Sequence, residues 1–427
     1  MLNLKVRKKN KYIVFFLLVI FLLLIGYFAV KIWQKNFKSP IGENFQFNYM
    51  TNKLWPKKSN QEMIVYGFLP YWNIDKVNIQ PELTHLSYFA LEVGTDGQIV
   101  TESQPGETEP GYRELNSDQF FNLINDHHLN LEIVLSQFDA KKIEQLLSDQ
   151  TAWLTLLEQI DSLLLAYPFS GINLDFEYQG EANELLRQQF TNLVISLHNH
   201  LAQHQEKINL SVDVYASAGD PAKKLLWNIP ALEPYLDYVV VMAYDFHRQS
   251  STQAGPGAPL FGAGGLWNSD INSLMKGFFE QVPKEKILLG VPFYGYAWQT
   301  DSLKPNANTY PGTGFTVSYE EVLNLKQLSG IWQNCENLEI FWQEDALSPF
   351  ASLSCGVKEK EDQELTDTTT EKSEKKINYL VYFEDEKSLQ YKIDFANQLE
   401  VAGIAIWALG YEGETRDLWE VVGKLRN

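Results

Sequence analysis

The chain is poor in histidine and in basic residues. Its seven histidines are scattered, with no HExxH motif and no pair at ligand spacing beside a carboxylate except His127 and His128 in a polar helical stretch. We therefore expect no metal and no other cofactor. Lysine and arginine number 35 against 54 acidic residues, which gives a formal net charge of −19. Because contacts with phosphate rest on basic surface, this balance argues against nucleic-acid binding.

Charge is absent from residues 12–30, a run long enough to cross about 30 Å of hydrocarbon as a helix. Five basic residues precede this run, whereas only Lys31, Lys35 and Lys38 follow it closely. The positive-inside rule then predicts a cytoplasmic tail over residues 1–11 and an extracytoplasmic remainder. A cleaved signal peptide is the alternative, but no small-residue cleavage site follows the run. We expect an uncleaved single-pass signal-anchor in the cell membrane, followed by a stalk over residues 31–62.

Cysteine is also scarce, with only Cys335 and Cys355, which stand 20 positions apart. Outside the membrane the compartment permits oxidation, so a disulfide between them is one alternative. By loop-closure reasoning such a bridge would stabilise the fold by about 3 kcal/mol. Two buried free thiols are the other alternative.

Eight strand-like apolar runs recur from residue 63 onward, and amphipathic stretches with helical spacing lie between most of them. The runs cover residues 63–70, 84–91, 131–138, 171–178, 208–215, 236–244, 286–294 and 401–409. This alternation predicts an α/β fold, a (β/α)8 TIM barrel over residues 63–415 with its active site where the strands end. An open doubly wound sheet is the alternative, but it would need a glycine-rich phosphate turn after an early strand. The first run leads instead into Tyr71 and Trp72.

More than a hundred residues separate the seventh and eighth runs, too many for one crossover helix. We expect a small inserted subdomain over residues 300–380 that forms a wall of the cleft. Within it, residues 358–376 are almost entirely charged, Thr, Ser or Gln, which predicts a disordered loop. A C-terminal helix is expected over residues 416–427.

Two carboxylates project together from the fourth run, in the stretch GINLDFEYQG. Read as a strand, it places Asn173, Asp175 and Glu177 on one face. Acids this close tend to share a proton, which raises the pKa of one and prepares it as a general acid. An acid and a nucleophile that attack directly stand about 5 Å or more apart, across the scissile bond. Adjacent acids fit better a mechanism in which the substrate's own acetamido group attacks.

Aromatic and polar side chains gather at the carboxyl ends of all eight predicted strands. Flat rings beside two carboxylates are what a glycosidase needs to hold pyranose faces and to donate a proton. The set comprises Tyr66, Phe68, Tyr88, Phe89, Ser136, Gln137, Asp175, Glu177, Asp213, Tyr215, Met242, Tyr244, Asp245, Tyr294, Tyr296, Trp298 and Trp407.

Four ordered motifs give the chain a resemblance to glycoside hydrolase family 18, the chitinase-like barrels. The family's DGxDxDxE is represented by SGINLDFE (residues 170–177), its MxYD by MAYD (242–245), its GxPxYG by GVPFYG (290–295), and its last aromatic by Trp407. The resemblance implies that Glu177 is the general acid and base, that Asp175 holds the acetamido N–H, and that Tyr244 donates to the acetamido carbonyl. Trp407 would floor the subsite. Substrate-binding roles are expected for Tyr66, Phe89, Asn173, Met242, Asp245, Tyr294 and Trp407.

The chain departs from this pattern where Ser170 and Asn173 replace the family's first two aspartates. Asn173 can hydrogen-bond Asp175 but cannot share a negative charge with it. The spelling NxDxE is similar to that of bacterial members acting on cell-wall or spore-cortex glycans. We therefore expect a membrane-anchored, monomeric retaining glycosidase that cleaves β-1,4 bonds at N-acetylglucosamine, in peptidoglycan first and chitin or chito-oligosaccharides second. A catalytically silent, lectin-like glycan-binding barrel is the alternative.

Overall fold

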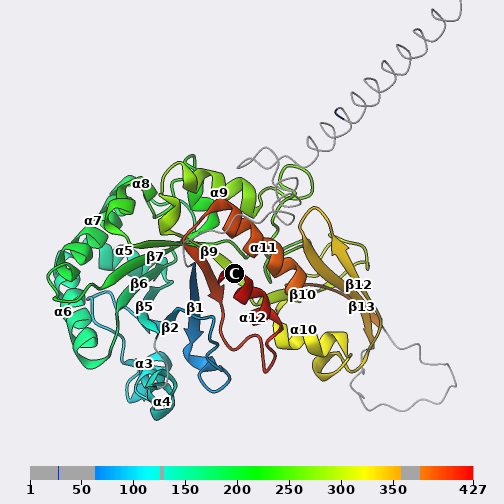
Figure 1. Cartoon of the computed structure of the whole chain (residues 1–427), viewed down its shortest axis with the longest axis horizontal. Coiled ribbons are helices and arrows are strands. Elements are labelled where there is room, and N and C mark those ends of the chain that lie inside the picture. Colours follow the sequence, from blue (N-terminus) through cyan, green and yellow to red (C-terminus); the bar gives the residue numbers. More distant parts are fainter. Residues whose placement is uncertain (1–26, 28–62, 126–128, 357–375, 427) are drawn as a thin grey trace, which may run out of the picture. The chain divides into compact units, whose positions relative to one another are not determined.

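The computed structural model describes Tyr27 and residues 63–125, 129–356 and 376–426 (Figure 1). Apart from Tyr27, the expected tail, anchor and stalk (residues 1–62) lie outside the described residues. So does the predicted loop 358–376, except that Lys376 begins a strand. Across the described ranges, no helix combines the length and the apolar character needed to cross a bilayer.

Eight parallel strands close into a barrel, as predicted, in the order β1-β15-β9-β8-β7-β6-β5-β2. Each lies within one of the eight apolar runs or ends within a residue of it, because a strand buried on both faces is marked by a near-continuous apolar segment. The strands are β1 (Ile64–Pro70), β2 (His85–Glu92), β5 (Asn130–Gln137), β6 (Gly171–Phe176), β7 (Asn209–Tyr215), β8 (Tyr238–Met242), β9 (Ile287–Pro292) and β15 (Gly403–Trp407).

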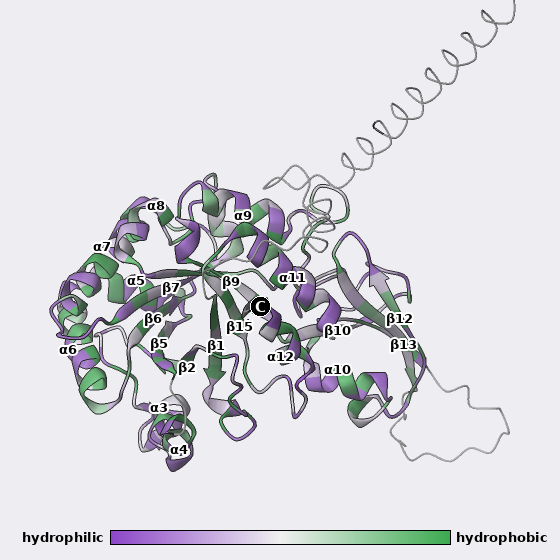
Figure 2. Cartoon of the chain, in the orientation of Figure 1, coloured by the Kyte–Doolittle hydropathy of each residue, from purple (hydrophilic) through white to green (hydrophobic). Residues whose placement is uncertain are grey.

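Helices surround the barrel strands (Figure 1), and longer ones such as α6 and α7 carry both hydrophobic and hydrophilic residues (Figure 2). They are α3 (Pro110–Leu115), α4 (Asp118–Asn125), α5 (Ala140–Ser148), α6 (Gln150–Ala166), α7 (Glu184–Leu201), α8 (Ile229–Leu232), α9 (Ile271–Phe279), α11 (Glu386–Leu399) and α12 (Asp417–Val422). Side-chain caps start several of them, including Asn183 on α7 and Asp270, with its reciprocal Ser273, on α9. A short hairpin, β3 (Glu102–Gln104) with β4 (Glu107–Thr108), precedes α3.

The amino end of the barrel is filled by a buried polar pair within an apolar cluster. Tyr66 is fully buried, and its hydroxyl lies 2.7 Å from Glu132 Oε2 and 2.8 Å from Ser87 Oγ. Burial raises the pKa of Glu132 to about 7, with the hydrogen bond from Tyr66 acting in the opposite direction. Tyr66 is therefore a core residue and does not face the cleft, which corrects its expected substrate-binding role.

The insertion between β9 and β15 is a five-stranded antiparallel sheet in the order β11-β10-β14-β13-β12, with helix α10 (Tyr319–Lys326). Its strands are β10 (Tyr294–Thr300), β11 (Phe315–Ser318), β12 (Cys335–Gln343), β13 (Ser348–Gly356) and β14 (Lys376–Tyr382). The sheet thus begins at Tyr294, earlier than the predicted residue 300. Gly295 permits this, since a Cβ there would lie 2.0 Å from the Tyr382 carbonyl oxygen.

The two cysteines pair across the register of this sheet. Cys335 on β12 faces Cys355 on β13, and they form a disulfide with an S–S distance of 2.07 Å. The disulfide alternative is therefore confirmed over the free thiols.

A buried ion pair joins the insertion to helix α11, and it supplies a test of the fold. Lys392 Nζ on α11 lies 2.6 Å from Glu384 Oε2 just after β14, and both side chains are buried. We predict that Lys392→Met destabilises the protein by about 3–5 kcal/mol, because it strands a buried carboxylate. Adding Glu384→Gln should recover most of that loss. Urea unfolding measures both, and a fully additive double variant would contradict the pairing.

Candidate active site

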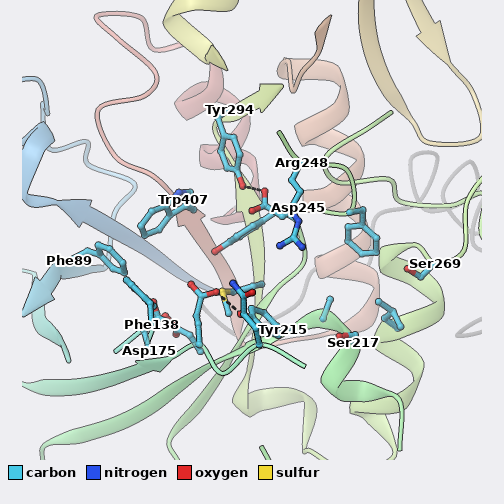
Figure 3. Close-up of a pocket in the computed structure, with 18 of the residues that line it drawn as sticks. Phe89, Phe138, Asp175, Tyr215, Ser217, Asp245, Arg248, Ser269, Tyr294 and Trp407 are labelled. Carbon is cyan, nitrogen blue, oxygen red and sulfur yellow. Dashed lines mark hydrogen bonds between the residues drawn. The ribbon is translucent and has the colours of Figure 1, made fainter. Parts of the chain in front are cut away.

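A cleft of about 720 Å³ opens at the carboxyl ends of the barrel strands. Figure 3 shows side chains from many strand ends converging on it. Its lining is Trp72, Phe89, Phe138, Asp175, Glu177, Gln179, Gly180, Asp213, Tyr215, Ala216, Ser217, Met242, Tyr244, Asp245, Phe246, Arg248, Ser269, Leu274, Tyr294 and Trp407. The predicted residues Glu177, Asp175, Tyr244, Phe89, Met242, Asp245, Tyr294 and Trp407 all lie here. Tyr66 and Asn173 do not.

Three carboxyl groups from two neighbouring strands lie at the floor of the cleft. Asp175 lies near the C-terminal end of β6, Glu177 directly follows that strand, and Asp213 lies on β7. Asp175 and Asp213 are only 3% and 2% exposed, whereas Glu177 is half-buried. Burial raises the pKa of Asp175 well above its usual range, and the Asp213 and Glu177 carboxylates add to this shift. The floor therefore holds protons at pH values where exposed carboxyls have lost them.

Glu177 is held by one specific partner. The Tyr215 hydroxyl donates a hydrogen bond to Glu177 Oε2 over 2.8 Å. Burial raises the pKa of Glu177, and this hydrogen bond acts in the opposite direction because it stabilises the charged carboxylate. A half-buried carboxyl with a raised pKa and an open approach from the cleft has the properties of a general acid.

Asn173 lies one layer beneath these acids and is fully buried. Its side-chain amide donates to Asp213 Oδ1 over 2.7 Å and to Ser211 Oγ over 2.9 Å. It was expected to contact the substrate and to hydrogen-bond Asp175. Its hydrogen-bond partners lie instead on β7, because the register between β6 and β7 places Asn173 opposite Ser211.

Asp245 is fixed on the opposite wall by two tyrosines. The hydroxyls of Tyr294 and Tyr296 both donate to Asp245 Oδ1, the second over 2.7 Å (Figure 3 shows the first). The Asp245 backbone has a φ of 61°, in the left-handed region that aspartate adopts more readily than most residues. The Asp245 carboxylate is therefore engaged in hydrogen bonds that fix this wall of the cleft.

Aromatic rings form a continuous band along the cleft. Phe89 meets Trp407 edge-on with ring centroids 4.5 Å apart, and it stacks near Phe138 at 6.3 Å. Trp72 contacts Phe89 at 6.2 Å. Trp72 and Phe138 are 44% and 48% exposed, so their faces are available to a ligand. Neither was predicted, although Trp72 comes two residues after β1 and Phe138 directly follows β5.

Arg248 is the single basic residue among those that line the cleft. Its side chain is exposed and extends from the wall that carries Asp245 (Figure 3). Its positive charge lowers the pKa values of Glu177 and Asp245, against the larger effect of burial. No ion pair of Arg248 occurs among the described residues. Sequence reasoning missed it because it lies in a loop three residues beyond the MAYD motif.

The cleft itself contains no histidine or cysteine among its described lining residues. The expectation that His127 and His128 form the sole notable histidine pair needs correction. That pair lies outside the described residues, and His200 with His204 meets Asp161 on the outer helices.

A parallel eight-stranded barrel with buried acids and aromatic walls at its carboxyl ends defines a glycoside hydrolase type of site. The family model "Glycosyl hydrolases family 18" matches residues 49–412, which is most of the chain. The chain therefore belongs to glycoside hydrolase family 18 and is a hydrolase of that family.

Relatives of known name agree with this placement. The chain is 26% identical over 299 residues to the uncharacterized glycosylase YvbX of Bacillus subtilis, covering 69% of this chain and 72% of that one. It spans only 49% of a Drosophila melanogaster relative and 35% of another Bacillus subtilis glycosylase. Its fold is similar to Ostrinia furnacalis Group IV chitinase in complex with allosamidin (TM-score 0.67, 20% identity, 85% and 98% covered). It is also similar to the Bacillus cereus spore cortex-lytic enzyme SleL (TM-score 0.63, 18% identity, 87% and 76% covered).

The hydrogen bond from Tyr215 predicts a defined change in pH dependence. Tyr215→Phe removes a donor that stabilises charged Glu177, so the pKa of Glu177 should rise and the acid should stay protonated to higher pH. We expect the alkaline limb of kcat/KM on a chito-oligosaccharide to move up by about 0.7 pH unit, the equivalent of about 1 kcal/mol. Tyr178→Phe is the matched control, since Tyr178 bonds Glu144 outside the cleft. If the alkaline limb of the Tyr215→Phe variant stayed in place or moved to lower pH, the role of Tyr215 in stabilising charged Glu177 would be contradicted.

Proposed function

We propose that this chain is a retaining glycosidase that cleaves β-1,4 bonds at N-acetylglucosamine with the substrate's acetamido group as nucleophile. The observation that carries this is the placement of the carboxyls. Asp175 and Glu177 come from the tip of one strand, and the facing carboxylate, Asp245, is already engaged by two tyrosine hydroxyls. This leaves an acid without a free partner carboxylate across the cleft, which suits acetamido participation.

In the first step, the acetamido oxygen attacks C1 while the bond from C1 to the leaving oxygen breaks. Glu177 gives its proton to that oxygen, and the sugar becomes an oxazolinium ion. Asp175 accepts a hydrogen bond from the acetamido nitrogen, and Tyr244 donates its hydroxyl to the acetamido oxygen. In the second step, water attacks C1 from the vacated side while the bond from C1 to the acetamido oxygen breaks, and Glu177 takes the proton of the water. Two inversions at C1 give net retention.

The aromatic band supplies the binding surface for successive sugars. Trp407, at the end of β15, floors the subsite where the bond breaks, with Met242 shaping its edge. Phe89, Phe138 and Trp72 continue the band away from Trp407 and would stack on further rings. A cleft of this kind fits a polymeric or oligomeric N-acetylglucosamine glycan as its partner.

Peptidoglycan is the polymer that we favour, with chitin second. Alternate sugars of peptidoglycan carry a lactyl group whose carboxylate is free where the stem peptide has been removed, whereas chitin is neutral. Arg248 offers a guanidinium to such a group, and bacterial relatives include a glycosylase and a spore cortex-lytic enzyme. Residues 12–30 support the further proposal that the enzyme is anchored in the cell membrane with its cleft outside.

The decisive comparison uses the full-length chain on a chito-oligosaccharide and on purified glycan strands of peptidoglycan, with mass analysis of the released ends. Glu177→Gln should lower kcat by about 10²–10⁴-fold on both, because the general acid is lost. Arg248→Gln should lower kcat/KM at least about 10-fold on peptidoglycan relative to the neutral oligosaccharide, the size of a lost charged hydrogen bond. Arg113→Gln, an exposed arginine outside the cleft, is the control.

The outcomes separate the alternatives. Equal turnover by wild type and Glu177→Gln would end the assignment of the acid. Binding of either glycan without turnover by any variant would favour the lectin-like barrel. Amidating the peptidoglycan carboxyls should abolish the Arg248 effect, and an effect equal on both glycans would reduce Arg248 to tuning Glu177.

A further inference from the structure

Asp161 and two histidines converge on the outside of the barrel, away from the cleft. Asp161 belongs to α6, His200 to the last turn of α7, and His204 to the turn that follows. His200 Nε2 lies 2.7 Å, and His204 Nε2 3.0 Å, from the same oxygen, Asp161 Oδ1. One ligand atom from each residue lies within 4.8 Å of the others.

This set has the chemistry of a transition-metal site. Two imidazole nitrogens and one carboxylate oxygen are ligands that zinc takes, with a fourth position left for water. The side chains are 24%, 31% and 46% exposed for His200, His204 and Asp161, so an ion has access from solvent. The carbonyl end of α7 adds the negative pole of a helix, which favours a cation.

We propose that Asp161, His200 and His204 bind one divalent transition-metal ion, zinc foremost. The ion would link α6 to α7, the helices that precede and follow the catalytic strand β6. Since barrel helices run opposite to the strands, the carboxyl ends of both helices lie on the face opposite the cleft. The ion therefore acts as a clamp on the fold and takes no part in the chemistry.

The test uses full-length protein without a histidine tag, stripped with EDTA. Zinc titrated by calorimetry should bind at one ion per chain and raise Tm by about 2–5 °C at a hundredfold excess over Kd. His200→Ala and His204→Gln should each lose most of this binding and the Tm response. His198→Ala is the matched control, because His198 faces Tyr235 and is outside the cluster.

Cobalt in place of zinc adds a readout that does not depend on stability. Wild type should give the intense visible absorption of a tetrahedral ion, and Asp161→Asn should weaken it. Absence of stoichiometric zinc binding by wild type would overturn the proposal. If the His204→Gln variant still bound zinc, or if the His198→Ala control lost zinc binding, the ion would lie elsewhere. Either result would also overturn the proposal.

A second inference concerns the floor of the cleft and rests on the proposed function. The family signature carries an aspartate where this chain has Asn173, yet a second buried carboxyl is present on the next strand. Asp213 is 2% exposed and accepts the Asn173 amide over 2.7 Å. The last paired residues of the two strands are Leu174 and Val212, so Asp213 stands one step further, beside Asp175.

The hydrogen bonds around this pair leave a place for a shared proton. Asp175 Oδ1 is buried and accepts no hydrogen bond from any described residue. Asn173 donates to Asp213 and so favours its charged form, and charged Asp213 in turn favours a proton on Asp175. The other titratable groups that face the pair are Glu177, Tyr215, Tyr244, Tyr66 and Glu132.

We infer that Asp213 is the positioning residue that replaces the family's aspartate at position 173, with the carboxyl and the amide exchanged between β6 and β7. Asp213→Asn should lower kcat about tenfold or more and shift its pH profile toward acid, because Asp175 loses the neighbour that retains its proton. The exchange Asn173→Asp with Asp213→Asn restores one carboxyl and one amide in contact. It should recover activity to within about threefold and restore the profile.

A readout independent of activity separates this inference from the proposed function. Because burial and proximity raise the pKa values of Asp175 and Asp213, the folded state binds more protons, and stability falls as pH rises above about 4. Tm should fall less steeply with pH in Asp213→Asn, and the double variant should restore the slope. If the wild type were inactive on every glycan tested, only the proposed glycosidase function would be refuted. The proposed exchange would be refuted if the slope of Tm against pH were unchanged in Asp213→Asn. It would also be refuted if the double variant recovered neither activity nor slope relative to Asp213→Asn.

Discussion

Burial of carboxyl groups at the mouth of a closed barrel is the constraint on which the rest of the site depends. A charged carboxylate removed from water is destabilised by several kcal/mol unless it is paired or hydrogen-bonded. Here no lysine or arginine pairs with Asp175 or Asp213 among the described residues. The cost of burying these carboxyls is reduced by the protons that they retain. It is reduced further by the hydrogen bonds from the Asn173 amide to Asp213 and from the Tyr215 hydroxyl to Glu177. The same relief prepares a proton donor, so stability and chemistry have one physical origin.

Much of the barrel was predictable because strands buried on both faces leave long apolar runs that no other element produces at this spacing. Asp175 and Glu177 were predictable from the alternation along β6 and into the residue that follows it. The partner of Asn173 was not, since it depends on the register between β6 and β7, and register is not visible within one strand. Trp72 lies in a short 3-10 helix after β1, and Phe138 and Arg248 lie in loops, so no period marks these side chains as facing the cleft.

Tyr66 shows how depth within a barrel limits such reasoning. It is an aromatic residue on a barrel strand, as Phe89 is, yet the two occupy different layers. Tyr66 pairs with His85 at the start of β2, whereas Phe89 pairs with Pro70 at the end of β1. Only the second position reaches the cleft. Residue type selects candidates, and stagger between strands decides which of them meet a ligand.

The inserted sheet has a consequence for how this enzyme can diversify. Its strand β10 leaves β9 after one residue, and Tyr294 and Tyr296, which hold Asp245, belong to that strand. The wall that would recognise the glycan is thus continuous with the support of a carboxylate beside the reacting centre. Grafting a different insertion from a relative would disturb both at once. Substrate range in such a chain is therefore expected to evolve through loop residues such as Arg248 and Phe138, with the sheet itself inherited as a unit.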